Sequence, residues 1–443
     1  MKIQTKEPVV NVGILSGNEI PFHLNGNFQL ANNYKIYSGK QKARFNENNV
    51  QFDNVDFENL LFVPMNEETD NFDLSDVVIG KDFHWEQKEN QRFTGSLKII
   101  VEENNLTAVN MLPIEDYLTS VISSEMSATS SLELLKAHAV ISRSWLLAQI
   151  QKSKKEKNAK SCSLFESNEE RICWYDREDH LNFDVCADDH CQRYQGITRA
   201  NTQAVKDAIA ATRGEILTYA GEICDTRFSK SCGGVSELFE NCWQNEPHPY
   251  LKKVVDNAQE KDDNALDLTN ESNAEKWIRS SHESFCNTTD KKILSQILNA
   301  YDRETPDFYR WKVEYSQQEL ATLIHKRTGI DFGEITDLIP VKRGVSGRLV
   351  KLKIVGTNRS LIIGKELEIR KMLSQSHLYS SAFIVEKEDI ENNVPQKFVL
   401  IGAGWGHGVG LCQIGAAVMA EKGYGYREIL GHYYKNTELN KMY

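Results

Sequence analysis

The sequence lacks an excess of positive charge and lacks an evident leader. Its 443 residues include 52 Lys and Arg but 63 Asp and Glu, which gives a formal net charge of −11 at pH 7. This balance argues against broad electrostatic binding to nucleic acid. The opening MKIQTKEPVVNVGILSGNEI contains no apolar run of the length found in a secretory signal peptide, so none is expected in this chain.

A membrane-spanning segment is also lacking. Residues 398–420 carry no charged side chain and are long enough to cross a bilayer. However, they contain six glycines together with His407 and Gln413, and the glycines cluster as they do in loops. We therefore expect a buried loop followed by a helix here, and no transmembrane segment.

Cysteine is sparse, because nine residues are too few for a disulfide scaffold in a chain of this length. The odd count leaves at least one thiol free or bound to metal. His180, Cys186, His190 and Cys191 match the ligand types and number of a closed tetrahedral zinc site. Their spacing is not that of a standard zinc finger, so the alternative is a disulfide or inert thiols beside surface histidines. Since all four ligands would come from the protein, we expect structural zinc, and a zinc hydrolase is the weaker hypothesis.

A pair of consecutive helices is predicted after the first quarter of the chain. Pro113 stands where a helix tolerates a missing N–H. Leu118, Val121 and Ile122 form an apolar stripe at helical spacing. Glu125 is the next member of that stripe, so a carboxyl group occupies a position where a core side chain is expected.

Glu125 is therefore the catalytic candidate. Burial disfavours the charged form of a carboxyl group, and a Glu that is protonated near neutral pH can donate a proton to a leaving group. The alternative is a partly exposed Glu at a helix end that pairs with Arg143 or with a lysine. The second helix is predicted to begin with a capping box between Ser130 and Glu133.

Two glycine-containing segments are candidates for ligand contact. In the first, Lys230 and Ser231 precede Gly233 and Gly234 after a predicted strand. Small residues there allow the backbone to approach a ligand closely, and Lys230 adds positive charge. A plain turn is the alternative.

In the second segment, glycine occupies every second position from 402 to 410, and Trp405 and His407 project between the glycines. Alternating glycine leaves one side of an extended segment free of side chains, and a sugar ring or a peptide can lie against such a surface. The alternative for His407 is a hydrogen-bonded core histidine.

The predicted fold class is α+β, with a helical catalytic core and β-rich peripheral regions built from discontinuous segments. The expected regions are a β-rich N-terminal region at 1–110, the helical core with the Cys/His segment at 111–255, an acidic insertion or linker at 256–305, a second β-rich region at 306–397, and a glycine-rich loop with C-terminal helices that completes the core at 398–443.

Several motifs in a fixed order resemble one family. The segments IEDYLTSVISSEM, LKAHAVISRSW, CADDHCQRYQG, FSKSCGGVSE, GWGHGVGLCQIGAAVMA and ILGHYYKNTEL together resemble the stage II sporulation protein D family, which includes the LytB amidase-enhancer proteins. The resemblance runs with interruptions from about Val10 to Leu439 and covers nearly the whole chain.

The resemblance implies a lytic transglycosylase that cuts peptidoglycan between N-acetylmuramic acid and N-acetylglucosamine and leaves a 1,6-anhydro product. Glu125 would be the general acid and base, and the segment from His180 to Cys191 would hold zinc that the chemistry does not require. Substrate contacts are expected from Arg143, Lys230, Ser231, Gly233, Gly234, Trp405 and His407.

The resemblance also carries a second hypothesis, since the LytB branch is assigned an enhancer role rather than catalysis. The chain would then bind peptidoglycan and stimulate a cell-wall amidase, and Glu125 would be a sugar hydrogen-bond partner. Both hypotheses imply an extracytoplasmic location in the periplasm or cell wall, with glycan strands as the partner and no nucleic acid.

Overall fold

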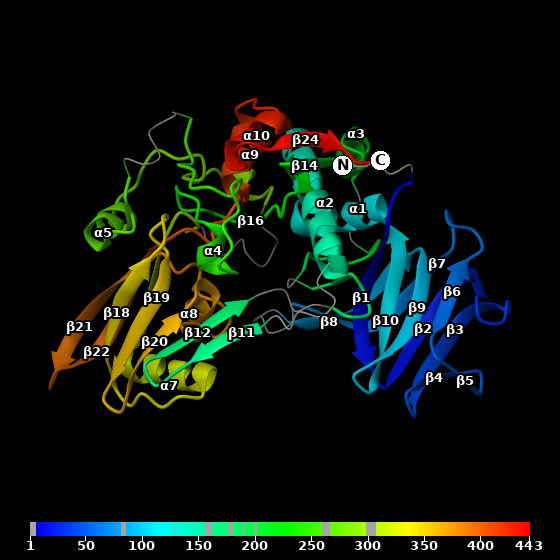
Figure 1. Ribbon diagram of the computed structural model, residues 1–443, viewed down its shortest axis with the longest axis horizontal. Helices are drawn as coiled ribbons and strands as arrows, with labels where there is room; N and C mark the ends of the chain where they lie inside the picture. Colours follow the sequence, from blue (N-terminus) through cyan, green and yellow to red (C-terminus); the bar gives the residue numbers. More distant parts are fainter. Residues whose placement is uncertain are drawn as a thin grey trace.

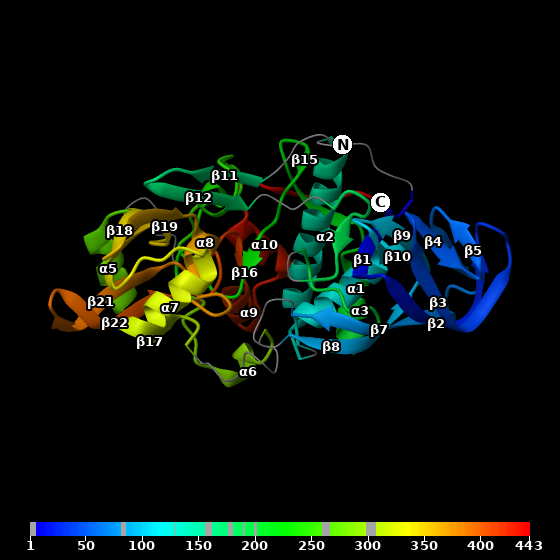
Figure 2. The same cartoon turned by 90° about the horizontal axis from the view of Figure 1, so that it is seen from below.

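A computed structural model describes residues 6–80, 86–127, 129–155, 162–175, 180–188, 191–198, 202–258, 266–297 and 307–443. Its helices and separate sheets confirm the predicted α+β class. Two β-rich parts lie at opposite ends of the molecule, and α2 (Leu132–Lys155) lies between them with the C-terminal helices (Figure 1, Figure 2).

The N-terminal part is an 11-stranded sheet within the described residues. In sheet order its strands are β13 (Val185–Cys186), β1 (Val9–Gly17), β10 (Asn105–Pro113), β9 (Ser96–Glu102), β6 (Leu60–Pro64), β2 (Glu19–Leu30), β3 (Ile36–Asn46), β4 (Asn49–Phe52) and β5 (Val55–Phe57), with β7 (Asn71–Ile79) beside β2 and β8 (Gln87–Thr94) beside β7. β10 runs directly into α1 (Ile114–Glu125), so the sheet fixes where this helix begins.

Helices from both ends of the sequence form the helical part. α1, α2 and α3 (Gln203–Ala211) are joined by α9 (Gln413–Glu421) and α10 (Tyr426–Tyr433), both of which pack on α2. A small sheet of β15 (Glu222–Ile223), β14 (Glu215–Tyr219) and β24 (Glu438–Lys441) links the same regions. One apolar core runs from Val10 to Met442, so this part is built from discontinuous segments.

The second β-rich part has a core of its own, to which Trp311, Ile354 and Phe398 belong. α7 (Gln317–Thr328) and α8 (Glu366–Met372) pack against its strands. A five-stranded sheet has the order β11 (Cys162–Glu166), β12 (Glu170–Tyr175), β20 (Ser360–Gly364), β19 (Leu349–Gly356) and β18 (Ile335–Arg343), and a three-stranded sheet has the order β17 (Arg310–Ser316), β22 (Val394–Ala403) and β21 (Phe383–Glu391).

The acidic stretch 256–305, for which an insertion or a linker was expected, packs against the rest of the protein where the structure describes it. It follows the short helix α4 (Phe239–Cys242) and contains α5 (Glu271–Arg279) and α6 (Lys291–Leu294). Phe285 and Ile297 are buried and belong to the large apolar core. The insertion therefore lies against the helical part, where it contacts the candidate site described below.

The glycine-rich loop differs from the expected extended surface. Gly404, Gly406, Gly408 and Gly410 all have positive φ, between +70° and +91°, which glycine adopts readily and other residues do not. Two of these glycines lie against the guanidinium group of Arg348, whose side chain is 1% exposed. A Cβ atom on Gly408 would lie 2.4 Å from Cζ of Arg348, and one on Gly404 would lie 2.9 Å from its Nη2. Gly404 and Gly408 thus make room for a buried arginine, whereas Gly406 and Gly410 lie against Ser229 and the carbonyl of Arg227.

Arg348 ties this loop to the turn that contains Lys230. Its Nε donates to the carbonyl of Gly406 at 3.1 Å, and its Nη1 donates to the carbonyl of Cys232 at 3.1 Å. Next to this turn, β16 (Phe228–Ser229) pairs in parallel with β23 (Leu411–Cys412). A buried cation without acceptors is very unfavourable, so these contacts hold the turn and the loop together.

We expect Gly408→Ala to destabilise the protein strongly. An alanine at positive φ costs about 1–2 kcal/mol, and here its Cβ also collides with Arg348. The matched control is Gly329→Ala, because Gly329 has φ +71° but nothing within 4 Å of the new Cβ. Urea unfolding should place Gly408→Ala below the control by at least about 1 kcal/mol. Equal losses would contradict the packing argument.

Candidate functional site

Glu125 is the last residue of α1, at the edge of the core. Ile114, Leu118 and Val121 are fully buried on the apolar stripe of the helix, whereas Glu125 is half-buried. The helix ends there because Met126 is extended, with φ −117° and ψ 153°. Oε1 of Glu125 accepts a hydrogen bond from the backbone N–H of Arg193 at 3.3 Å. The carboxyl group is thus held in place without being enclosed.

The chain that follows the Cys/His segment supports α1. The hydroxyl group of Tyr117 donates to Oε1 of Gln192 at 3.3 Å. The backbone N–H of Gln195 donates to the hydroxyl group of Ser120 at 3.1 Å. Residues 192–195 therefore run along α1, and the position of Glu125 depends on how the Cys/His segment is anchored.

Three of the four predicted zinc ligands lie together. The ligand atoms of His180, Cys186 and Cys191 all lie within 4.8 Å of one another. His180 Nε2 is 3.6 Å from Cys191 Sγ, and that sulfur accepts a hydrogen bond from the backbone N–H of Cys186 at 3.4 Å. His190 lies outside the described residues. This donor set fits a zinc ion, which would connect β13 to the segment beside α1. Zinc at this site stays a prediction.

The loop between α1 and α2 is held by the insertion. The carbonyl of Gln296 accepts from the backbone N–H of Ser127 at 2.9 Å and from the hydroxyl group of Ser130 at 2.8 Å. Oε1 of Gln296 accepts from the backbone N–H of Ser131 at 3.0 Å. The predicted capping box of Ser130 with Glu133 is wrong, because the Ser130 N–H donates to the carbonyl of Ser127 and the Glu133 carboxylate accepts from Lys136 and from the Tyr426 N–H.

Lys230 contacts the same insertion. Its Nζ donates to the carbonyl of Ile297 at 3.0 Å, so neighbouring residues of the insertion bind the lysine turn and the loop after Glu125. His138 of α2 is fully buried, and Gln413 Nε2 donates to its Nε2 at 3.0 Å. Burial, together with the charge of Lys230, lowers the pKa of His138 to about 3. This histidine is therefore neutral at physiological pH.

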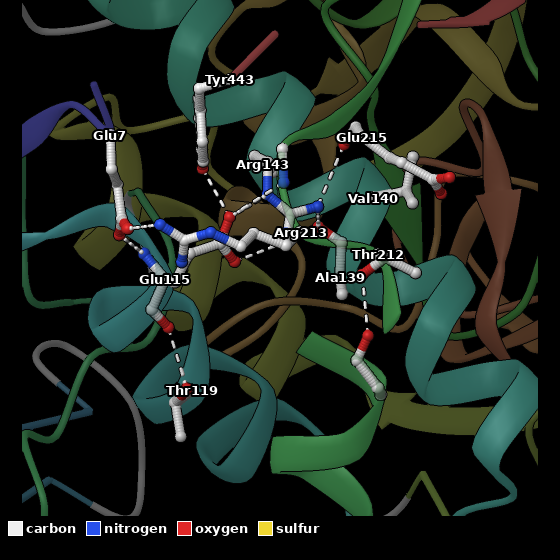
Figure 3. A network of polar contacts seen from close by, with 12 residues as sticks. Glu7, Glu115, Thr119, Ala139, Val140, Arg143, Thr212, Arg213, Glu215 and Tyr443 are labelled. Carbon is white, nitrogen blue, oxygen red and sulfur yellow. Dashed lines mark hydrogen bonds and ion pairs between the residues drawn. The ribbon is translucent and has the colours of Figure 1, made fainter. Parts of the chain in front are cut away.

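Arg143 is buried in a network of polar contacts around Glu115 (Figure 3), and this burial argues against the predicted contact with substrate. Its side chain is 0% exposed, and its Nε and Nη2 donate to the Glu115 carboxylate at 3.0 and 2.6 Å. Glu115 also accepts from the Gly214 backbone and from the Tyr443 hydroxyl group. Arg143 Nη1 donates to the carbonyl of Glu215 at 3.0 Å. The arginine therefore joins α1, α2 and β14 and does not pair with Glu125.

The Ser231–Gly234 turn is also buried and does not offer a ligand surface. Ser231 is 0% exposed, and its backbone exchanges two hydrogen bonds with Trp405 at 2.8 and 3.1 Å. Gly233 lies against the backbone of Gly404, and Gly234 lies against Trp277. These three predicted substrate residues shape the turn, while Lys230 at its start remains partly exposed.

Trp405 and His407 have different surroundings. Trp405 is half-buried and stacks on Phe308, with ring centroids 4.7 Å apart. His407 uses its Nδ1 to accept from the backbone N–H of Val409 at 3.0 Å, and the backbone of Phe228 supplies a further hydrogen bond. Burial, with nearby arginines, places the pKa of His407 well below its usual value. His407 therefore fits the structural alternative, and Trp405 remains a candidate for substrate contact.

A surface cavity of about 670 Å³ lies elsewhere, on the N-terminal sheet. Phe22, Lys40, Asp73 and Arg92 line it, and none of the predicted site residues does.

A second thiol cluster escaped the sequence analysis. Cys232, Asp256, Cys286 and Cys412 are all buried and lie side by side. Burial raises the pKa of the Cys412 thiol, but hydrogen bonds with Cys232 and Cys286 outweigh this effect and lower the pKa to about 6. These residues are spread over most of the second half of the chain, so no local pattern links them.

Family models cover much of the chain. Residues 102–219, which contain Glu125, Arg143 and the Cys/His segment, match the model described as stage II sporulation protein. The predicted resemblance to this family is confirmed. Residues 237–410, which contain Asp256 and Arg348, match a model described as a domain of unknown function.

No described helix is long and apolar enough to cross a membrane.

Curated relatives agree with this match. The chain is 24% identical over 339 residues to the stage II sporulation protein D of Bacillus subtilis, which covers 75% of this chain and 76% of that protein. It is 25% identical over 343 residues to the amidase enhancer of the same organism, covering 73% of this chain but only 40% of the enhancer. An uncharacterized protein of Brachyspira hyodysenteriae is 26% identical over 347 residues, with 78% and 72% covered.

We expect Arg143→Met to cost about 3–5 kcal/mol of stability, because it leaves the Glu115 carboxylate buried without its cation. The control is Arg213→Met, since Arg213 is 51% exposed in its ion pair with Glu7 and should contribute at most about 1 kcal/mol. Urea unfolding measures both. In the double variant Arg143→Met, Glu115→Gln, part of the loss should be recovered. A small loss in Arg143→Met alone would contradict the structural role.

Stability should fall on acidification because His138 stays neutral in the fold. Its pKa is about 3 in the native state and about 6.5 when unfolded, so between these values only the unfolded chain binds the proton. From pH 7 to pH 5 the wild type should lose about 2 kcal/mol more than His138→Gln. Urea unfolding at both pH values tests this, with the exposed His325→Gln as control. An identical pH slope in wild type and His138→Gln would refute it.

Proposed function

We propose that this protein is a lytic transglycosylase that cleaves peptidoglycan glycan strands, with Glu125 as the general acid and base. The observation that carries the proposal is the half-buried Glu125 at the end of α1, which one backbone N–H orients. The names of the relatives, stage II sporulation protein D and amidase enhancer, support a cell-wall substrate and an extracytoplasmic location.

One acid suffices for this reaction. Glycosidases that use water or a covalent intermediate need two carboxyl groups. In a lytic transglycosylase the 6-hydroxyl group of N-acetylmuramic acid attacks the anomeric carbon of its own ring. Glu125 protonates the glycosidic oxygen as the bond breaks, and the resulting carboxylate accepts the proton of the 6-hydroxyl group. Because nucleophile and electrophile belong to one ring, the step has the entropic advantage of an intramolecular reaction.

Arg143 is bound to the Glu115 carboxylate, so it is not the partner of Glu125. Lys230 and the half-buried Trp405 are the candidates for contact with the glycan. Trp405 offers an apolar ring face of the kind that packs on sugars, and Lys230 offers a hydrogen-bond donor.

The second candidate is a non-catalytic peptidoglycan-binding protein that stimulates a cell-wall amidase. The relative named amidase enhancer favours it. Under this hypothesis Glu125 accepts hydrogen bonds from sugar hydroxyl groups, and the same residues bind glycan without cutting it.

We expect Glu125→Gln to abolish formation of anhydro-ended products. The substitution keeps the shape and the acceptor for the Arg193 N–H but removes the transferable proton, which is worth about 10²–10⁴ in rate. Purified glycan strands stripped of stem peptides are incubated with each protein, and the products are identified by mass spectrometry.

The matched control is Glu103→Gln, an exposed glutamate in the turn between β9 and β10, which should keep wild-type activity. Intact glycan with the wild type, together with binding that Glu125→Gln weakens, would favour the enhancer hypothesis. Equal cleavage by wild type and Glu125→Gln would exclude Glu125 as the acid.

A further inference from the structure

Three thiols and a carboxylate from separate segments meet in the core. Cys232, Asp256, Cys286 and Cys412 are between 0% and 3% exposed. Their Sγ and carboxylate oxygen atoms all lie within 4.8 Å of one another. We propose that these four side chains bind a zinc ion as a closed structural site, distinct from the predicted site in the Cys/His segment. The proposal does not rest on the transglycosylase activity.

The fold brings the four ligands together through two backbone pairings. β16 and β23 run in parallel, which places Cys232, three residues beyond Ser229, near Cys412 at the end of β23. In the insertion, the backbone N–H of Phe285 donates to the carbonyl of Asp256 at 2.7 Å, and this brings Cys286 to the carboxylate. The site therefore joins the lysine turn, the C-terminal tail and the insertion.

The spacing suits a tetrahedral metal–thiolate site. Cys232 Sγ lies 3.7 Å from Cys286 Sγ. With Zn–S bonds of about 2.3 Å at tetrahedral angles, two sulfur ligands are about 3.8 Å apart. A disulfide needs about 2.05 Å, and the eight cysteines whose side chains are described are free thiols. Three thiolates favour soft or borderline ions, and a fourth protein ligand closes the site as in structural zinc centres.

The ligands are also oriented by outer hydrogen bonds, as metal ligands are. Cys412 Sγ accepts from the backbone N–H of Cys232 at 3.2 Å. Asp256 Oδ1 accepts from the hydroxyl group of Tyr433 at 2.7 Å, and its Oδ2 accepts from the backbone N–H of Cys286 at 3.0 Å. Gly415 in the first turn of α9 leaves room for this carboxylate, because a Cβ there would lie 2.8 Å from both of its oxygens.

The charges around the cluster fit a bound ion. A divalent cation with three thiolates and one carboxylate carries a net charge of −2. Arg348 binds the carbonyl of Cys232, and Arg310 binds the carbonyl of Gly233 at 3.0 Å. Within the described residues, both guanidinium groups donate only to neutral oxygens, those of Ser231, Cys232, Ser346 and Gly406 for Arg348 and those of Gly233, Trp277, Ser280 and Tyr309 for Arg310.

Within the described residues neither guanidinium group pairs directly with a carboxylate, although the Ser346 hydroxyl group connects Arg348 to the buried Glu237. An anionic metal–thiolate centre beside the same turn would add compensating negative charge for both cations. Without the ion, the Asp256 carboxylate is 0% exposed, and the nearest basic side chain among the described residues is the imidazole of His432, 3.6 Å away. The metal therefore satisfies both the acidic and the basic groups.

To test the proposal, the full chain is purified in the presence of a reductant, and its zinc content is measured by elemental mass spectrometry. Cys286→Ser and Cys412→Ser should each lose one zinc per chain relative to wild type. Cys224→Ser is the matched control, because Cys224 is buried but outside both clusters, and it should keep the wild-type content. Cys191→Ser, which disables only the Cys/His segment, should retain one zinc per chain.

Loading the Cys191→Ser protein with Co²⁺ gives a second readout that does not depend on folding of the Cys286 and Cys412 variants. A strong thiolate-to-cobalt absorption band is expected, and addition of zinc should abolish it. Zinc that disappears entirely in Cys191→Ser, with no cobalt band, would overturn the proposal. So would thiol mapping that finds a Cys232–Cys286 disulfide in the freshly purified protein.

Discussion

The structure depends on one buried guanidinium group. Arg348 cannot be left unpaired in the core, and its acceptors lie in the glycine loop, in the lysine turn and in its own hairpin. The Ser346 hydroxyl group, which accepts from Arg348, donates to the buried Glu237 carboxylate at 2.6 Å. Arg348 therefore joins the turn at Ser231 and Cys232, which lies between the two family-model matches, to the glycine loop and the hairpin within the second match.

The environment of each acid on α1 determines what it can do. Glu115 is 6% exposed, and its oxygens accept hydrogen bonds from Arg143, Gly214 and Tyr443, so it has a structural role. Glu125, at the other end of the helix, has one backbone donor and partial exposure. The same residue type thus provides a cross-link at the start of the helix and a group available for proton transfer at its end.

The sequence predicts those strands and helices whose apolar residues recur with a regular period. The alternating strands before Pro113 and the stripe that ends at Glu125 follow from periods of two and 3.6 residues. The convergence of Cys186 with Cys191 was predictable because only five positions separate them. The partner of Arg143, the occupant of the glycine loop and the contact between Gln296 and Ser130 were not predictable, because each joins segments that no periodicity relates. For the same reason the alternating glycines were misread, since Gly404 and Gly408 leave room for the distant Arg348, and Gly406 and Gly410 lie against Ser229 and Arg227.

A segment that follows each thiol cluster in the sequence contacts α1 or the loop after it, close to Glu125. Residues 192–195 follow the first cluster and contact α1 at Tyr117, Ser120 and Glu125, the last through the backbone N–H of Arg193. The segment that carries Cys286 continues to Gln296, which binds the loop immediately after Glu125, and to Ile297, which binds Lys230. Neither cluster has to touch a substrate to affect the candidate site. By anchoring these two segments, the clusters would help to position the Glu125 carboxyl group and Lys230 relative to each other. Precise placement of reacting groups depends on such supporting residues as much as on the reacting groups themselves.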